Sequence, residues 1–217
     1  MDAKVGLKPE VKVIKEPIPH LLVPGEMGAV LELTVKDKDG KVTEHRVMRS
    51  KSYVKQFLQL LYVQMNACGT TGAVSIRDIA NALQDIWATK DNFKCDADAG
   101  EVNEGIIVGT GTTAPTIDDY KIETIIDHGT DPGELEYSAV VIAAATSDAT
   151  TSQVTITRDF ANGSGGEIIV NEIALYVWAW SDTPPENIMT IRDVIGGGIA
   201  VPDGQTLTVN YREQAVV

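Results

Sequence analysis

Turn-forming residues divide the second half of this 217-residue chain into short apolar segments, and this division constrains the fold more than any other feature. The turns are marked by clusters rich in glycine or proline at 162–166, 183–185, 196–198 and 202–204. Between and before them lie apolar or alternating segments at 105–109, 135–145, 153–160, 167–180, 189–195 and 206–211. Such punctuation without helical spacing is typical of antiparallel strands. We therefore predict a mainly β protein in which residues 101–217 form an antiparallel β-sandwich or jelly-roll-like domain.

A β-hairpin is predicted near the front of the chain, over residues 29–48. Two runs rich in alternating apolar residues, Val30–Val35 and Val42–Met48, flank the pair Asp39-Gly40. This pair supplies the positive φ angle that tight hairpin turns require, so the sequence indicates both strands and the turn between them.

A helix is predicted after the hairpin, ending at Met65. Ser50 or Ser52 is placed to cap its first turn. Apolar side chains then recur at steps of three and four, which is typical of one helix face. The members of this stripe are Tyr53, Val54, Phe57, Leu58, Leu61 and Met65. We expect this face to pack on the hairpin.

The stretch from Val74 to Trp87 fits two structures. Ser75 and Asp78 have the spacing of a helix capping box, and the following apolar residues fit a helical stripe. A hairpin that turns near Ala80-Asn81 fits equally, and the sequence leaves the choice between them open.

Three parts are expected along the chain, giving an α+β protein overall. Residues 1–25 contain four prolines, which favour an extended arm. Residues 26–100 hold the hairpin and the helix, and a polar, acidic segment at 90–101 separates them from the sandwich domain at 101–217.

The charge balance limits the classes of partner. The chain has 31 acidic against 18 basic residues and a formal net charge of −13, which argues against nucleic acid and anionic membranes. It has no apolar run long enough to span a membrane and no apolar stretch typical of a secretory signal, so we expect synthesis in the cytoplasm.

No set of residues predicts an enzyme. The three histidines lie in separate contexts, and no serine has the spacing of a nucleophile elbow. Gly109–Thr113 lacks the lysine of a phosphate-binding loop and is better explained as a sharp exit from a strand. The acid pairs Asp118-Asp119 and Asp127 with Asp131 could serve hydrolysis, but pairs are unavoidable among so many acids. We therefore predict no catalytic residue and no cofactor.

Metal binding and disulfide formation have little support. Asp96, Asp98 and Glu101 invite a calcium hypothesis, yet they do not follow the ligand order of an EF-hand, and a solvated loop is expected there. We expect Cys68 and Cys95 to be free thiols, while a bridge between them stays open as an alternative.

The most apolar segment carries an aromatic row. Side chains alternate along a strand, so Tyr176, Trp178 and Trp180 share one face. The other face has Ile173, Leu175, Val177 and Ala179. Either this is a central strand covered on both faces, or the aromatic face meets a subunit or a glycan.

A resemblance extends over about half of the chain. Its motifs are the segments 105–124, 154–160, 162–165, 170–176, 191–194 and 199–209. In this order they resemble structural proteins of tailed phages and related virions, in which a strand ends in Gly-Thr-Gly and a Val-Pro-x-Gly turn introduces the last strand. Val201-Pro202-Asp203-Gly204 matches that turn. The resemblance implies a virion protein of the capsid-decoration or tail and fibre type.

Assembly is the function expected from these observations. We expect a closed cyclic homo-oligomer, such as a trimer, that contacts other virion proteins. The arm residues Val11, Val13 and Ile18 and the row of Tyr176, Trp178 and Trp180 are the candidate interface. The alternatives are a carbohydrate-binding or host-adhesion module that stacks a surface glycan on the row, and, third, a hydrolase.

Overall fold

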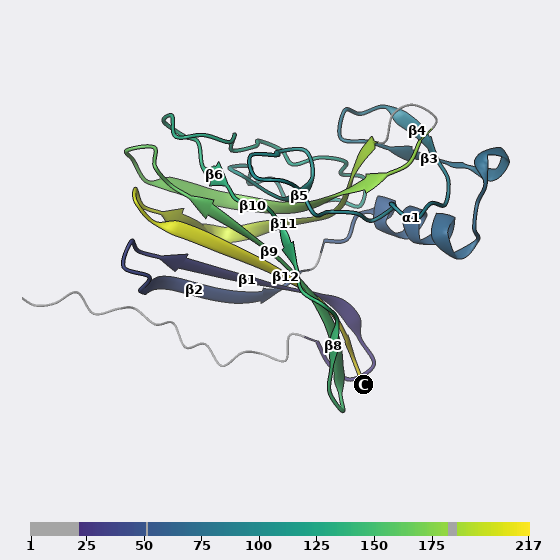
Figure 1. The fold of residues 1–217 in the computed structure, drawn as a ribbon, viewed down its shortest axis with the longest axis horizontal. Helices are drawn as coiled ribbons and strands as arrows, with labels where there is room; N and C mark the ends of the chain where they lie inside the picture. Colours follow the sequence, from purple (N-terminus) through teal and green to yellow (C-terminus); the bar gives the residue numbers. More distant parts are fainter. Residues whose placement is uncertain (1–21, 51, 182–185) are drawn as a thin grey trace, which may run out of the picture.

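Two antiparallel sheets form most of the protein (Figure 1). The structure is a computed structural model that describes residues 22–50, 52–181 and 186–217. The larger sheet, sheet A, has the order β2-β1-β12-β9-β6, with β7 and β8 also paired to β9. Its strands are β1 (Met27–Lys36), β2 (Val42–Arg49), β6 (Glu136–Tyr137), β7 (Val141–Ile142), β8 (Thr146–Ser147), β9 (Thr151–Ala161) and β12 (Thr206–Val216).

The smaller sheet, sheet B, has the order β11-β10-β5. Its strands are β5 (Gly105–Gly109), β10 (Ile168–Ala179) and β11 (Glu186–Val201). The prediction of a mainly β protein with antiparallel sheets in a sandwich-like arrangement is confirmed.

One hydrophobic core includes side chains from both sheets. On β12, buried Leu207, Val209 and Tyr211 alternate with partly exposed residues, as expected for a strand with one buried face. The Tyr211 hydroxyl spans the two sheets, because it donates to Ile173 O at 3.4 Å and lies 3.1 Å from Asp193 Oδ2. The core therefore holds the two sheets together.

The hairpin predicted near the front of the chain is confirmed. β1 and β2 are antiparallel neighbours, and Gly40 adopts a φ of 77° in the turn that joins them. β1 also pairs with β12 along its whole length, from Met27 to Lys36. The hairpin therefore belongs to the same sheet as β9 and β12, although the boundary predicted at residue 100 lies between them in the sequence.

The helix α1 (Lys55–Met65) is present, but its predicted cap and its predicted packing are wrong. Val54 precedes it without a side-chain cap, because residues 52–54 run extended beside β11, where Val54 N donates to Thr190 O at 3.0 Å. The helix packs against β11 and against β3 (Val74–Arg77), and not on the hairpin.

The stretch that sequence alone left open is a hairpin of β3 and β4 (Leu83–Ile86). It follows the short 3-10 turn η1 (Thr70–Gly72). Asp78 determines the turn, because its carboxylate accepts hydrogen bonds from Ala82 N at 2.8 Å and from Gln84 Nε2 at 2.7 Å. Asn81 takes a positive φ of 70° there, a conformation that asparagine tolerates well.

A fully buried arginine, Arg158 on β9, fixes the irregular segments beside sheet A. All five of its N–H groups donate to backbone carbonyl oxygens at 2.7–3.1 Å, and its guanidinium lies 4.8 Å from the centre of the Tyr137 ring. The carbonyls belong to Asp98, Glu101, Glu104, Ile106 and Ser138. Burial lowers the pKa of Arg158 to about 10, so the group keeps its charge at neutral pH.

We predict that Arg158→Met lowers the free energy of unfolding by at least about 3 kcal/mol, because several carbonyl groups would lose their partner inside the protein. Urea unfolding followed by tryptophan fluorescence measures this change. Arg46→Met, at a partly exposed arginine of β2, is the control and should cost less than about 1 kcal/mol. Equal losses in both variants would contradict the role given to Arg158.

Candidate interaction surface

The aromatic row does not form a continuous surface. Tyr176 is buried, and its hydroxyl accepts a hydrogen bond from Ile122 N at 2.7 Å. Burial raises its pKa above the ordinary value. β10 lies between β5 and β11, so of the two interpretations of this segment the central strand is correct. Tyr176 supports the fold, and as a surface residue it was wrongly predicted.

The two tryptophans lie where β10 ends. Trp178 is half-buried, with Lys94 Nζ 5.1 Å from its ring centre, and Trp180 is 37% exposed. Their rings meet edge to face at 6.1 Å, and Trp180 N donates to Asn92 Oδ1 at 2.9 Å. Of the three residues of the row, Trp180 alone is exposed. The other predicted interface residues, Val11, Val13 and Ile18, lie outside the described residues.

A buried carboxylate, Glu172 of β10, organises the loop that covers the outer face of sheet B. Its Oε1 accepts hydrogen bonds from Gly111 N at 2.9 Å and Thr124 N at 2.8 Å. Its Oε2 accepts from Glu123 N at 3.0 Å and Arg192 Nε at 2.9 Å. Four donors therefore surround one carboxylate that has no exposed surface.

The glycines of the Gly109–Thr113 loop are needed for this contact. A Cβ atom on Gly111 would lie 2.2 Å from Glu172 Oε1, and one on Gly109 would lie 2.4 Å from Thr124 O. The loop thus directs a backbone N–H at an anion, as phosphate loops do, but the anion is a carboxylate of the protein itself.

Arg192 of β11 links Glu172 to the same loop. Its Nη1 donates to Asp119 Oδ2 at 2.7 Å and its Nη2 to Thr113 O at 3.1 Å. Burial alone would raise the pKa of Asp119, but hydrogen bonds from Thr116 and Arg192 outweigh it and hold the pKa below its ordinary value. This cluster is internal and supports the fold.

The predicted acid pairs have structural partners. Asp118 binds Lys55 Nζ at 2.6 Å, while Asp119 binds Arg192. The second pair lies in a turn, in which Leu135 N donates to Asp127 O at 3.1 Å and Asp131 N donates to Glu134 Oε2 at 3.1 Å.

The residues of the calcium hypothesis are also engaged elsewhere. Asp96 pairs with Lys94 at 2.8 Å, and Glu101 Oε1 accepts from Asn103 N at 2.8 Å. Among the described residues, no three His, Cys, Asp or Glu side chains form a group that could hold a metal ion. Cys68 and Cys95 are free and buried, as expected.

The α1 surface is the candidate site that the structure brings together; we define it as Leu58, Leu61, Tyr62 and Met65. Leu58 is 64% exposed, Tyr62 55% and Met65 78%. The helix packs inward through Gln56, Leu60 and Val63 instead. Half of the apolar stripe predicted to face the core, Leu58, Leu61 and Met65, therefore lines this surface.

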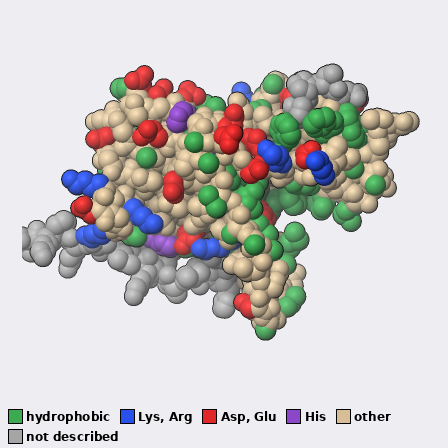
Figure 2. All heavy atoms as spheres, in the orientation of Figure 1, with side chains coloured by type: hydrophobic (Ala, Val, Ile, Leu, Met, Phe, Trp, Pro, Cys, Tyr) green, Lys and Arg blue, Asp and Glu red, His purple; other side chains and the backbone are tan. Residues whose placement is uncertain are grey.

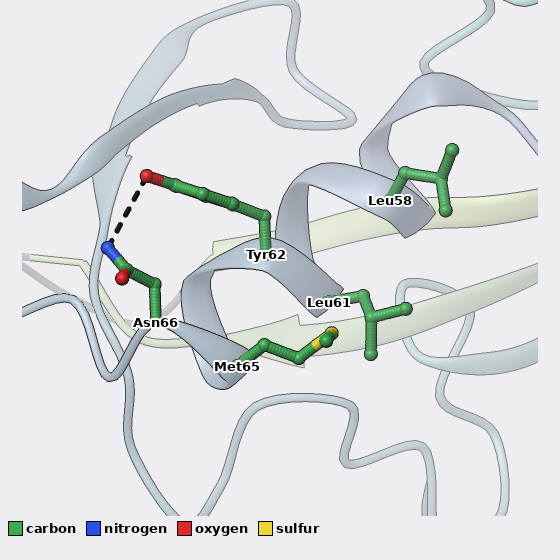
Figure 3. A pocket seen from close by; sticks show the side chains of 5 residues that line it. All are labelled: Leu58, Leu61, Tyr62, Met65 and Asn66. Carbon is green, nitrogen blue, oxygen red and sulfur yellow. Dashed lines mark hydrogen bonds between the residues drawn. The ribbon is translucent and has the colours of Figure 1, made fainter.

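A shallow groove runs along this surface (Figure 3). Asn66 completes its lining and donates through Nδ2 to the Tyr62 hydroxyl at 3.3 Å. Hydrophobic side chains gather at this end of the molecule, which carries α1, β3 and β4 (Figure 2). The sole charged residue of the helix, Lys55, is paired with Asp118. The groove can therefore bind an apolar side chain.

Comparison with protein-family models, curated proteins and solved structures gives no match for this chain. None of the helices in the described part has the length and apolar character that crossing a bilayer needs. The function must therefore be argued from the surface itself.

We predict that Glu172→Gln lowers the free energy of unfolding by about 2–4 kcal/mol, although it conserves size. An amide has one acceptor oxygen, so its NH2 group would face N–H donors that now bind the carboxylate. Thermal and urea unfolding measure this loss. Glu136→Gln, at an exposed acid of β6, should stay within about 0.5 kcal/mol of wild type. A neutral effect at Glu172 would show that the cluster does not hold the loop.

Proposed function

We propose that this protein is a structural component of a virus particle, assembled by subunit contacts on a capsid surface or in a tail or fibre. The resemblance of its back half to virion structural proteins supports the setting. The α1 surface supports assembly and is the observation on which the proposal depends.

The α1 surface has the chemistry of a protein contact. Its side chains lie at i, i+3, i+4 and i+7, the spacing with which a helix inserts anchors into an apolar groove. Copies that each carry a net charge of −13 repel one another, and an uncharged surface is where they can meet at least electrostatic cost. Burial of these side chains in a homo-oligomer would remove apolar area from water.

The predicted arm supplies a second means of assembly. β2 ends sheet A, and in the described part of the chain only β1 pairs with it. An edge of this kind can accept an added strand. Val11, Val13 and Ile18 are the side chains by which the arm of one subunit would bind the sheet of a neighbour, within a cyclic oligomer such as a trimer.

The carbohydrate-binding alternative takes second place. It needs Tyr176, Trp178 and Trp180 as one exposed row, whereas Tyr176 is buried and Lys94 lies over Trp178.

We predict that Leu58→Glu with Met65→Glu weakens self-association by at least about tenfold, because each contact would bury carboxylates without partners. Light scattering after size exclusion measures the mass against the 23.3 kDa of one chain. Ile169→Glu, at an exposed position in β10, is the control and should keep the wild-type mass. A wild-type protein that stays a monomer at high concentration would overturn the proposed function.

Deletion of residues 1–21 should reduce the oligomer while the thermal unfolding of the remaining chain stays cooperative. The change isolates the arm, because β1 and every later element remain. Lys12→Gln with Lys15→Gln is the control for charge, and Val11→Asp with Val13→Asp should reproduce the deletion. An oligomer of unchanged mass after deletion would exclude the arm as a contact.

A further inference from the structure

One end of sheet A extends past sheet B (Figure 1). The first part of β9, together with β8 and the ends of β1 and β12, projects from the body of the protein. β9 continues to pair with β12 as far as Thr151 and Val216. We call residues 25–28, 141–155 and 213–217 the projecting end.

The face of sheet A that meets sheet B continues onto the projecting end but loses its cover. Ile156 lies opposite Tyr211, whose hydroxyl reaches sheet B, and Ile156 is buried. On the same face of β9, Val154 is partly exposed and Ser152 is exposed. Met27 lies in the same cross-strand row as Ser152 and is 71% exposed. The inner face of the sandwich therefore opens to solvent at this end.

This uncovered face is mostly apolar, and the few charges at it have partners in the same subunit. Glu213, opposite Val154, accepts a hydrogen bond from the Tyr53 hydroxyl, and Glu26 pairs with Arg49. Val217 is 76% exposed and Ile142 is 44% exposed. Between residues 139 and 157 the single charged residue is Asp148, in the turn between β8 and β9. In Figure 2 the same end consists mostly of uncharged groups, with some hydrophobic side chains and an acidic one among them. In a chain of net charge −13, such a region offers little to a charged partner.

We propose that the projecting end packs against the projecting end of a second copy, about a two-fold axis. This inference rests on the proposed function, because it adds a second subunit contact at a place distinct from the α1 surface. Identical faces whose few charges have partners within the subunit meet with little repulsion, and an isologous contact needs no complementary partner surface.

The number of separate self-contacts determines how large an assembly the subunits can form. A single isologous contact closes at a dimer, whereas a second one at another place joins dimers into larger assemblies. The projecting end would then be the dimer contact, and the α1 surface would connect dimers.

Thiol cross-linking tests this contact directly. The native cysteines are buried, so Ser152→Cys places one accessible thiol on the proposed contact face. A short bis-maleimide reagent at low protein concentration should convert most of this variant to covalent dimers. Gln214→Cys places a thiol on the opposite face of the same end and should react at least about tenfold more slowly.

The two proposals fail in different ways. Cross-linking of Ser152→Cys should persist when Leu58→Glu and Met65→Glu are added, since those changes affect the α1 surface alone. Met27→Glu should abolish it and should also raise the dissociation constant of the dimer by at least about tenfold. A wild-type oligomer in which Ser152→Cys reacts no faster than Gln214→Cys would overturn the inference alone, whereas a wild-type monomer would overturn both.

Discussion

The buried pair of Glu172 and Arg192 is the interaction on which the arrangement of sheet B depends. Sheet B has only three strands, and its outer face is covered by a loop without regular structure. Such a loop leaves backbone groups without partners unless side chains bind them. Glu172 satisfies three N–H groups of the loop, and Arg192 satisfies the carbonyl of Thr113. The backbone of the loop thus forms hydrogen bonds with a charged pair of side chains, where the backbone of a strand would form them with a neighbouring strand.

Arg158 binds backbone carbonyl groups beside sheet A, as Glu172 binds backbone N–H groups beside sheet B. Glu172 accepts hydrogen bonds mainly from N–H groups, whereas Arg158 donates to five backbone carbonyl groups, four of which belong to residues outside the strands. Both groups are inside the protein, where an unpaired charge would be costly, and both are saturated by their partners. The polar interior therefore serves the fold, and the surfaces available for function lie outside it, on α1 and at the projecting end.

The sequence predicted the architecture better than the surfaces. Alternation and turn residues suffice for the strands and for the hairpin at Asp39-Gly40, because both are local properties. The orientation of α1 was not predictable, since Leu60 and Val63 on one side and Leu58 and Met65 on the other give the helix two apolar faces. The contacts of Glu172 join residues about 50–60 positions apart, and no local spacing signals them.

The two proposed contact surfaces have one type of side chain in common among their most exposed residues. Met65 on α1 and Met27 at the projecting end are both largely exposed to solvent. Oxidation converts a methionine thioether to a polar sulfoxide, which is reversed by reductases and not by simple dilution of the oxidant. Peroxide would therefore reach both surfaces of a free subunit before the buried core, and oxidised subunits would assemble less well while staying folded.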